Sequence, residues 1–253
     1  MPAPLVSFDL DGVLIQNAFR DCVVPRLRAI VRSAPALRHL PPEEADRRMA
    51  DEVRRVWGEL QRAGEWVLGY DWDHVYGRAA ERLGAPALPA VGPIVQACCE
   101  AREGIRLLPE SAEGLALLAD EGVRMVAVTN NFSTVQAPVL EAFGILDRFD
   151  AVLGPDRLGT AKPDPAVFAG LGGLQAHVGD TLSTDVAAAR EAGVRSVWIA
   201  RGEERRAALA RAPRDDLSEA EWHAAWDEDP YLRLYPALTR ERHGRADGGA
   251  LTP

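Results

Sequence analysis

The residues Leu5-Val6-Ser7-Phe8-Asp9-Leu10-Asp11-Gly12-Val13 decide how this chain is organised, because an apolar run there ends in two carboxylates and a glycine. A short run with Val and Phe predicts a buried strand of a parallel sheet. Since side chains alternate along a strand, we expect Asp9 and Asp11 on one side at its carboxyl end. Two like charges so close repel each other unless a cation lies between them or one is protonated. Gly12 allows a sharp turn and a close approach to a ligand.

The bulk composition is that of an ordinary globular protein. The chain has 253 residues, 47% hydrophobic and 26% charged, enough for one large domain or two moderate ones. Its formal net charge of −9 argues against a general binder of nucleic acid or of anionic membranes. No apolar run approaches ~18 residues, so we expect no transmembrane helix. The amino terminus lacks a basic region followed by a separate apolar stretch. We expect a cytoplasmic protein, because its cysteines are typical of reduced thiols.

Cysteine and lysine are informative because both are rare. The three cysteines, Cys22, Cys98 and Cys99, have no metal-ligand spacing and form no even set of bridges, so we expect reduced thiols. Lys162 is the single lysine of the chain, and arginine supplies the other cationic side chains at neutral pH. A chain that uses arginine nearly everywhere is expected to need a compact ammonium group at that one position.

The hydrophobic pattern divides the chain into three parts. Residues 16–104 carry apolar residues at three- and four-residue spacing, which predicts an all-helical insertion. In residues 105–201 helical and strand patterns alternate, which predicts a parallel α/β core together with residues 1–15. Residues 202–253 form an extension, which we expect to end in about ten mobile residues. Helices are expected in this extension at 203–212 and 218–227.

Local signals place further elements within these parts. After the first strand, we expect strands at residues 123–128, 151–153, 176–179 and 194–200. Ser133 followed by Gln136 is the capping-box pattern of a helix start. Asp164 before Pro165 predicts an N-cap with proline in the first turn. His177 lies inside a strand, so we interpret it as a core histidine with satisfied hydrogen bonds rather than a catalytic residue.

Polar side chains follow four of the predicted strands. Asp9 and Asp11 follow the first, Thr129 the second and Asp180 the fourth, while Lys162 comes shortly after the third. Because the carboxyl ends of parallel strands meet at one edge of a sheet, we expect these five side chains to converge there.

Taken in order, these motifs resemble those of the haloacid dehalogenase superfamily over residues 4–201. The resemblance rests on Asp9-Leu10-Asp11-Gly12-Val13, Val128-Thr129-Asn130, Lys162-Pro163, and Gly179-Asp180 with Asp185. It implies a Rossmann-like, three-layer α/β/α core. The insertion at 16–104 resembles the helical C1 cap of phosphatases in this superfamily, which closes over small phosphorylated substrates. Two departures are a short stretch between Lys162 and Asp180 and the extension beyond Arg201.

The resemblance also implies a phosphoryl-transfer site with Mg²⁺. Asp9 would be the nucleophile that forms an aspartyl-phosphate. Mg²⁺ prefers oxygen ligands, and Asp9, the backbone carbonyl of Asp11 and the carboxylate of Asp180 would supply them. The Asp11 side chain would act as general acid toward the leaving group and then as base toward water.

Other positions would bind the phosphate or support these groups. Thr129, Asn130 and Gly12 would contact phosphate oxygens, through a backbone N–H near Asn130. Lys162 would offset the negative charge of the carboxylates and the substrate. Asp185 would act indirectly, by orienting metal-bound water or Lys162.

The leaving group depends on cap residues, for which Arg20, Asn17 and Phe132 are candidates, while the aromatic residues of the cap are expected mainly to form its core. The carboxylate of Asp11 favours phosphate esters, because dehalogenating members lack this acid. The hypothesis is a Mg²⁺-dependent hydrolase of a small phosphorylated metabolite, monomeric or homodimeric, without nucleic-acid or membrane partners. A phosphosugar mutase and a non-catalytic phosphate-binding module remain as alternatives.

Overall fold

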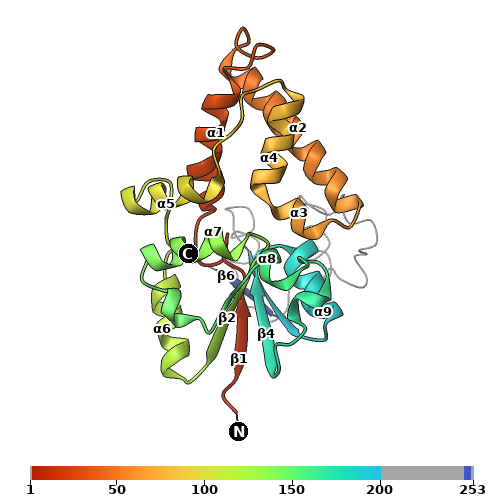
Figure 1. Cartoon of the computed structure of the whole chain (residues 1–253). Helices are drawn as coiled ribbons and strands as arrows, with labels where there is room; N and C mark the ends of the chain where they lie inside the picture. The colour runs from red at the N-terminus through yellow and green to blue at the C-terminus, as the bar shows by residue number, and fades with distance from the viewer. Residues whose placement is uncertain (1, 201–247, 252–253) are drawn as a thin grey trace.

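A parallel sheet of six strands lies at the centre of the computed structural model, which describes residues 2–200 and 248–251 (Figure 1). The strands lie in the order β3-β2-β1-β4-β5-β6, and each neighbouring pair is parallel. Their bounds are Leu5–Phe8 (β1), Arg124–Val128 (β2), Val152–Leu153 (β3), Leu174–Gly179 (β4), Arg195–Ala200 (β5) and Gly248–Leu251 (β6). The predicted parallel α/β sheet is therefore confirmed, with the first strand near its middle.

Helices cover both faces of this sheet. They are α6 (Ser111–Asp120), α7 (Ser133–Ala142), η2 (Leu146–Arg148), α8 (Pro155–Leu158), η3 (Pro165–Phe168), η4 (Leu182–Val186) and α9 (Ala187–Glu191). Met125 and Ala127 of β2 belong to an apolar cluster with residues of α6 and α7. Val126 and Val128 face the other way and belong to a cluster with residues of η3 and α9. The alternation along one strand thus produces the predicted three layers.

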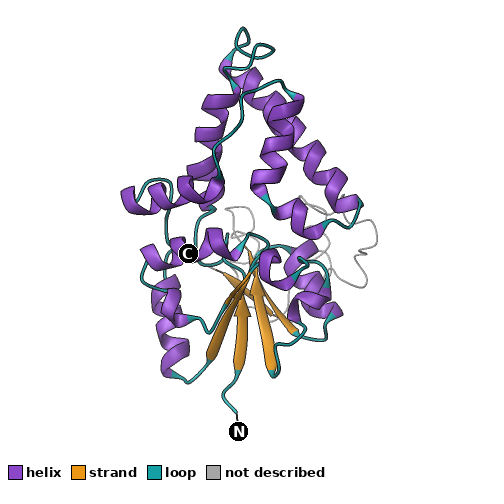
Figure 2. Ribbon diagram, viewed as in Figure 1, coloured by secondary structure: helices purple, strands orange, loops and turns teal. Residues whose placement is uncertain are grey.

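The residues between β1 and α6 are helical, as expected, and contain no strand over 16–104. Their helices are η1 (Phe19–Val23), α1 (Val24–Val31), α2 (Pro42–Arg62), α3 (Trp66–Tyr70), α4 (Trp72–Arg82) and α5 (Val91–Ala101). Figure 2 shows α1 to α4 beyond the end of the sheet that lies opposite the amino terminus. The two connections to the sheet lie side by side, since Ile15 forms a bridge with Leu107 and the N–H of Gln16 donates to the Arg106 carbonyl at 2.8 Å.

One of the two capping predictions is confirmed and the other is wrong. The Asp164 side chain accepts a hydrogen bond from the Ala166 N–H at 2.9 Å, as an N-cap does. Ser133 does not cap α7 through a box with Gln136. Its N–H and its hydroxyl both donate to Asp156, at 2.7 and 2.6 Å, because α8 packs beside the start of α7. Gln136 is thereby free to turn toward the sheet edge.

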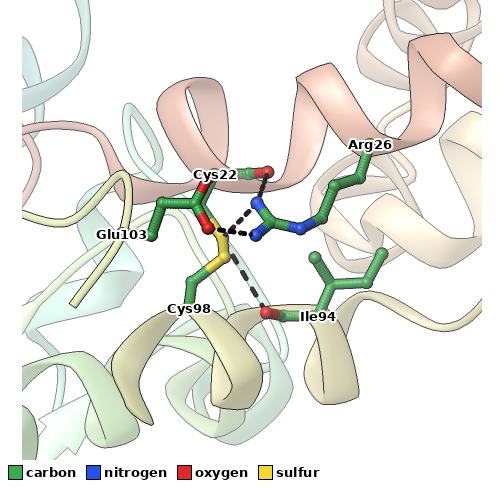
Figure 3. The surroundings of a disulfide bond; sticks show 5 residues. All are labelled: Cys22, Arg26, Ile94, Cys98 and Glu103. Carbon is green, nitrogen blue, oxygen red and sulfur yellow. Dashed lines mark hydrogen bonds and ion pairs between the residues drawn. A yellow bond between two sulfur atoms is a disulfide. The ribbon is translucent and has the colours of Figure 1, made fainter. Parts of the chain in front are cut away.

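The expectation of reduced thiols is wrong for two of the three cysteines. Cys22 of η1 and Cys98 of α5 form a disulfide bond (Figure 3). Cys99 is free and buried. Arg26 lies beside this disulfide and donates hydrogen bonds to the Cys22 carbonyl at 2.9 Å and to Glu103 Oε2 at 2.9 Å. The bridge joins residues 76 apart in sequence, and the spacing of the cysteines alone contains no signal that η1 and α5 are neighbours.

The carboxyl-terminal extension differs from expectation where it is described. Residues 248–251, expected to be mobile, form β6 and pair with β5 in parallel. The helices expected at 203–212 and 218–227 lie outside the described residues. Among the helices that are described, none combines the length and apolar character needed to cross a bilayer.

The disulfide predicts a redox-dependent stability. Under oxidising conditions, replacing Cys22 and Cys98 together by alanine should lower the free energy of unfolding by roughly 2–4 kcal/mol, because the bridge restricts a long loop in the unfolded chain. Urea unfolding with and without dithiothreitol measures this. The Cys99→Ala variant is the control, since it keeps the bridge and should be destabilised by dithiothreitol as much as the wild type. A wild type unaffected by dithiothreitol would contradict the bridge.

Candidate active site

The ammonium group of Lys162 is buried among oxygen atoms at the carboxyl end of the sheet, with 2% of its side chain exposed. It donates to Asp9 Oδ1 at 2.9 Å, to Asp185 Oδ1 at 2.5 Å and to the Val128 carbonyl at 2.9 Å. These bonds use all three of its donors. Burial opposes the charge, but Asp185 and Asp9 raise the pKa of Lys162 above its usual value. The planar fork of an arginine could not direct three donors in this way.

Asp185 accepts a hydrogen bond from Lys162 and is itself held in place by further hydrogen-bond donors. Its Oδ1 also accepts from His177 Nε2 at 3.0 Å, and its Oδ2 accepts the Thr181 N–H at 3.0 Å. A carboxylate can only accept, so His177 has its proton on Nε2, and its Nδ1 accepts the Ser7 hydroxyl at 2.9 Å. Burial would raise the pKa of Asp185, but Lys162 and His177 hold it well below its usual range. Burial lowers the pKa of His177, which keeps the ring neutral.

Three carboxylates here could hold a metal ion. Asp9, Asp180 and Asp185 offer oxygen atoms within 4.8 Å of one another, and no second group of this kind occurs in residues 2–200 and 248–251. Because both oxygens of Asp185 already accept hydrogen bonds, Asp9 and Asp180 are the better ligands. Carboxylate oxygens, with the nearby backbone carbonyl of Asp11 as the expected third donor, are the ligands that Mg²⁺ prefers.

Gly12 is required by the close approach of Asp180. A Cβ at position 12 would lie 2.1 Å from Asp180 Oδ2, so this carboxylate would have to move. The residue also has φ of +85°, a conformation that side chains rarely adopt. The glycine after the two aspartates therefore lets the chain turn directly against the Asp180 carboxylate.

Three carboxyl groups of the site resist ionisation, namely those of Asp9, Asp11 and Asp180. Burial raises the pKa of Asp9 well above its usual value, although Lys162 opposes the shift. Burial and the neighbouring Asp185 raise the pKa of Asp180 to about 7. Burial also raises the pKa of Asp11 to about 6. A bound cation would favour the charged forms of the ligating carboxylates, so this cluster fits the implied metal.

Asp11 receives hydrogen bonds from two side-chain amides. Asn131 Nδ2 donates to Asp11 Oδ2 at 2.6 Å, and Gln136 Nε2 donates to the same oxygen at 2.5 Å. Both donors oppose the effect of burial on the pKa of Asp11. The sequence did not indicate either amide as a site residue. Gln136 matched a capping pattern, and Asn131 lies just after the Val128-Thr129-Asn130 motif without being part of it.

Thr129 and Asn130 lie beside this group, at the end of β2. Thr129 is buried, and its hydroxyl accepts the Asn131 N–H at 3.1 Å. The Asn130 amide pairs with the backbone of Lys162, accepting its N–H at 2.8 Å and donating to its carbonyl at 2.9 Å. The side chain of Asn130 thus positions the lysine loop, and a phosphate contact there remains a prediction for its backbone N–H.

Arg20 is not brought into the cluster. Its guanidinium pairs with Asp21 at 2.8 Å, and its side chain is 67% exposed. The Asn17 side chain accepts the Arg20 N–H at 2.7 Å and so stabilises the start of η1. The structure therefore gathers Asp9, Asp11, Lys162, Asp180 and Asp185 at one place and leaves the cap candidate Arg20 outside it.

Comparison with known proteins matches this arrangement to hydrolases. The family model of haloacid dehalogenase-like hydrolases matches residues 4–193, and a HAD-hydrolase-like model matches residues 174–220. A phosphoglycolate phosphatase of Pectobacterium atrosepticum is 33% identical over 216 residues, covering 78% of this chain and 80% of that protein. A phosphoserine phosphatase of Thermus thermophilus is 31% identical over 227 residues, covering 78% of this chain and 89% of that protein.

Solved structures share the fold. A HAD phosphatase from Thermococcus onnurineus superposes with a TM-score of 0.63 at 22% identity, covering 79% of this chain and 87% of the other. The L-2-haloacid dehalogenase of Xanthobacter autotrophicus superposes with a TM-score of 0.55 at 18% identity, covering 98% of this chain and 94% of the other.

The contact beneath Asp180 predicts the effect of a methyl group at position 12. Gly12→Ala should reduce kcat by at least about tenfold, because a Cβ displaces the Asp180 carboxylate and strains the backbone. Phosphate release measures the effect. Gly144→Ala is the matched control: Gly144 has φ of +67°, and beyond its chain neighbours nothing lies within 4 Å of where a Cβ would stand, so it has the strain without the clash. Equal activity of the two variants would contradict the steric argument.

The raised pKa values predict how stability depends on pH when divalent cations are removed. The folded pKa of Asp180 is about 7 against an ordinary 3.8, so the folded chain binds more protons between these values. Stability is therefore greater at acid pH and is lost as pH rises through about 7, by on the order of 4 kcal/mol from this group alone. Thermal unfolding in chelator measures it. Asp180→Asn should flatten the dependence, and a wild type that becomes more stable up to pH 8 would contradict the assignment.

Proposed function

Because the chain belongs to the haloacid dehalogenase-like hydrolase family and is a phosphatase, we propose that it hydrolyses a small phosphomonoester through a phosphoryl group carried on Asp9, with Mg²⁺ bound at the site. One observation carries the proposal: a fully hydrogen-bonded Lys162 ammonium lies between Asp9 and Asp185, and the carboxylate of Asp180 lies beside both. Phosphoryl transfer needs a nucleophile and positive charge around the phosphate oxygens, and this arrangement can supply both.

In the first step the phosphoryl group is transferred from the substrate to Asp9, and several residues take part. An Asp9 oxygen attacks phosphorus while the bond from phosphorus to the leaving oxygen breaks. Asp11 gives its proton to that oxygen, so an alcohol leaves and an aspartyl-phosphate remains. Lys162 keeps Asp9 oriented and offsets the added negative charge. Thr129 and backbone N–H groups near Asn130 and Gly12 would hold the phosphate oxygens.

The second step returns the enzyme to its starting state. Asp11, now a carboxylate, takes a proton from water as the water attacks phosphorus, and inorganic phosphate leaves Asp9 as a carboxylate. Asp9, Asp180 and the Asp11 carbonyl would hold Mg²⁺, which when bound adds positive charge beside the phosphate oxygens. Asp185 acts by fixing Lys162 rather than by binding substrate.

The substrate class follows from the relatives and from the insertion over residues 16–104, which we propose is a cap that closes over the site. Phosphoglycolate and phosphoserine are the first compounds to test, since the proteins matched above bear these names.

The cytoplasm is the proposed location, and the proposed assembly is a monomer or homodimer. Fractionation of cells tests the location. Alkylation of thiols in intact cells then shows whether Cys22 and Cys98 are bridged there, and a bridged pair would contradict the cytoplasm, because disulfides are rare in reducing compartments. Light scattering tests the assembly.

Asp9→Asn is the decisive variant. It should lower kcat for phosphate release by at least about 10³-fold, because an amide cannot accept the phosphoryl group, while the circular dichroism spectrum shows that the fold is kept. Asp147→Asn, at an exposed position of η2, is the control and should keep full activity. Chelator should abolish wild-type turnover and Mg²⁺ should restore it. Activity of Asp9→Asn would exclude the covalent route. Interconversion of sugar phosphates without phosphate release would instead indicate a mutase.

A further inference from the structure

A line of hydrogen bonds connects the helical insertion to Asp11. The indole Nε1–H of Trp72, the first residue of α4, donates to Asn131 Oδ1 at 2.6 Å. Asn131 Nδ2 donates onward to Asp11 Oδ2 at 2.6 Å. The proposed reaction steps do not use Trp72, and its aromatic neighbours alone would make it a core residue of the cap.

The indole determines which way the Asn131 amide faces. A tryptophan N–H can only donate, so it must meet the oxygen of the amide rather than its nitrogen. With Oδ1 held by Trp72, the amide nitrogen of Asn131 is directed at Asp11. Without that donor the amide could turn over and place its oxygen against the Asp11 carboxyl group, where two acceptors would repel each other.

The same bonds determine which oxygen of Asp11 can carry a proton. Oδ2 accepts from Asn131 and from Gln136, so a proton on Oδ2 would displace those donors. Oδ1 is buried and has no hydrogen-bond partner among the described residues, although the Ala18 N–H lies near the carboxyl group. An acid proton therefore belongs on Oδ1, the oxygen of Asp11 that accepts from no side chain.

The contact is part of a broader junction between the insertion and the sheet edge. Tyr70, two residues before Trp72, accepts a hydrogen bond from Asn130 Nδ2 at 2.8 Å. Within the insertion, Trp72 stacks on Phe19 with ring centroids 4.9 Å apart and contacts Tyr76 edge-on at 6.2 Å. The indole is thus held rigidly by α4 and η1, and its N–H reaches Asn131 when these helices are seated on the core.

From this geometry we propose that Trp72 is a positioning residue that acts through Asn131 to orient Asp11 as the general acid, so that Asp11 is aligned when the cap is seated on the core. The inference rests on the proposed function, because it assigns Asp11 the transfer of a proton to the leaving oxygen. Trp72 does not contact the reacting atoms, and it determines how well that proton is directed.

The test separates an effect on proton transfer from an effect on structure. An alkyl phosphate such as phosphoglycolate needs a proton on its leaving oxygen, whereas p-nitrophenyl phosphate leaves as a stabilised anion. Values of kcat/KM report steps through formation of the aspartyl-phosphate and exclude its later hydrolysis. Trp72→Phe, which keeps an aromatic ring against Phe19, should lower kcat/KM for phosphoglycolate by at least about tenfold and for p-nitrophenyl phosphate by less than about threefold. If the wild type prefers another alkyl phosphate, that ester replaces phosphoglycolate.

Two further variants show whether the effect passes through Asn131. Asn131→Ala should show the same selective loss, and the double variant should lose no more than Asn131→Ala alone, because the two residues act in series. Tyr76→Phe is the matched control, since it removes a hydroxyl from the same aromatic cluster and should leave the ratio of the two substrates unchanged. Should Trp72→Phe fail to fold, Asn131→Ala alone decides the ratio.

The possible outcomes are distinct. A selective loss on the alkyl ester that is not additive with Asn131→Ala supports the role. Equal losses on both esters, no loss on either, or fully additive losses would overturn it while leaving the proposed function intact. A wild type that hydrolyses neither ester in Mg²⁺ would overturn the proposed function, and the role of Trp72 with it.

Discussion

The site depends on one buried ammonium group that holds several carboxyl groups together. Asp9 and Asp185 both lie against Lys162, whose third donor is used by the Val128 carbonyl, so the cation is anchored to β2 as well as to its counter-charges. Isolated charges are costly to bury, and breaking such a set by removing one partner leaves the others uncompensated. The composition of the chain reflects this demand, because its one lysine stands here among many arginines elsewhere.

Around that cation the polar groups form two connected systems with different tasks. One runs inward from Asp185 through His177 to Ser7 and is buried within the sheet, where it keeps Lys162 in place. The other runs outward from Asp11 through Asn131 to Trp72 of the insertion. The inward system lies wholly within the core, because Ser7 belongs to β1, His177 to β4 and Asp185 to η4. The outward system spans two parts of the chain, so its geometry depends on how these parts are seated.

The sequence predicted the sheet and the set of converging side chains because both follow from short-range patterns, namely apolar runs and the residues that end them. It did not predict the donors to Asp11. Gln136 fitted a capping box, but Asp156 of a neighbouring helix bonds Ser133 instead, a tertiary contact that no local pattern contains. The Cys22–Cys98 bridge was missed for the same reason, since it depends on the contact between η1 and α5. His177 was correctly interpreted as a satisfied core residue.

The bridge between Ile15 and Leu107 has a consequence for how such a molecule can diversify. The segment between them leaves the sheet and returns to it at neighbouring backbone positions, with Gln16 and Arg106 hydrogen-bonded to each other. Viewed from the strands, the whole intervening stretch is equivalent to an ordinary surface loop, whose length places little demand on strand register. Evolution can therefore lengthen, shorten or exchange it as a module without changing how the strands of the sheet pair.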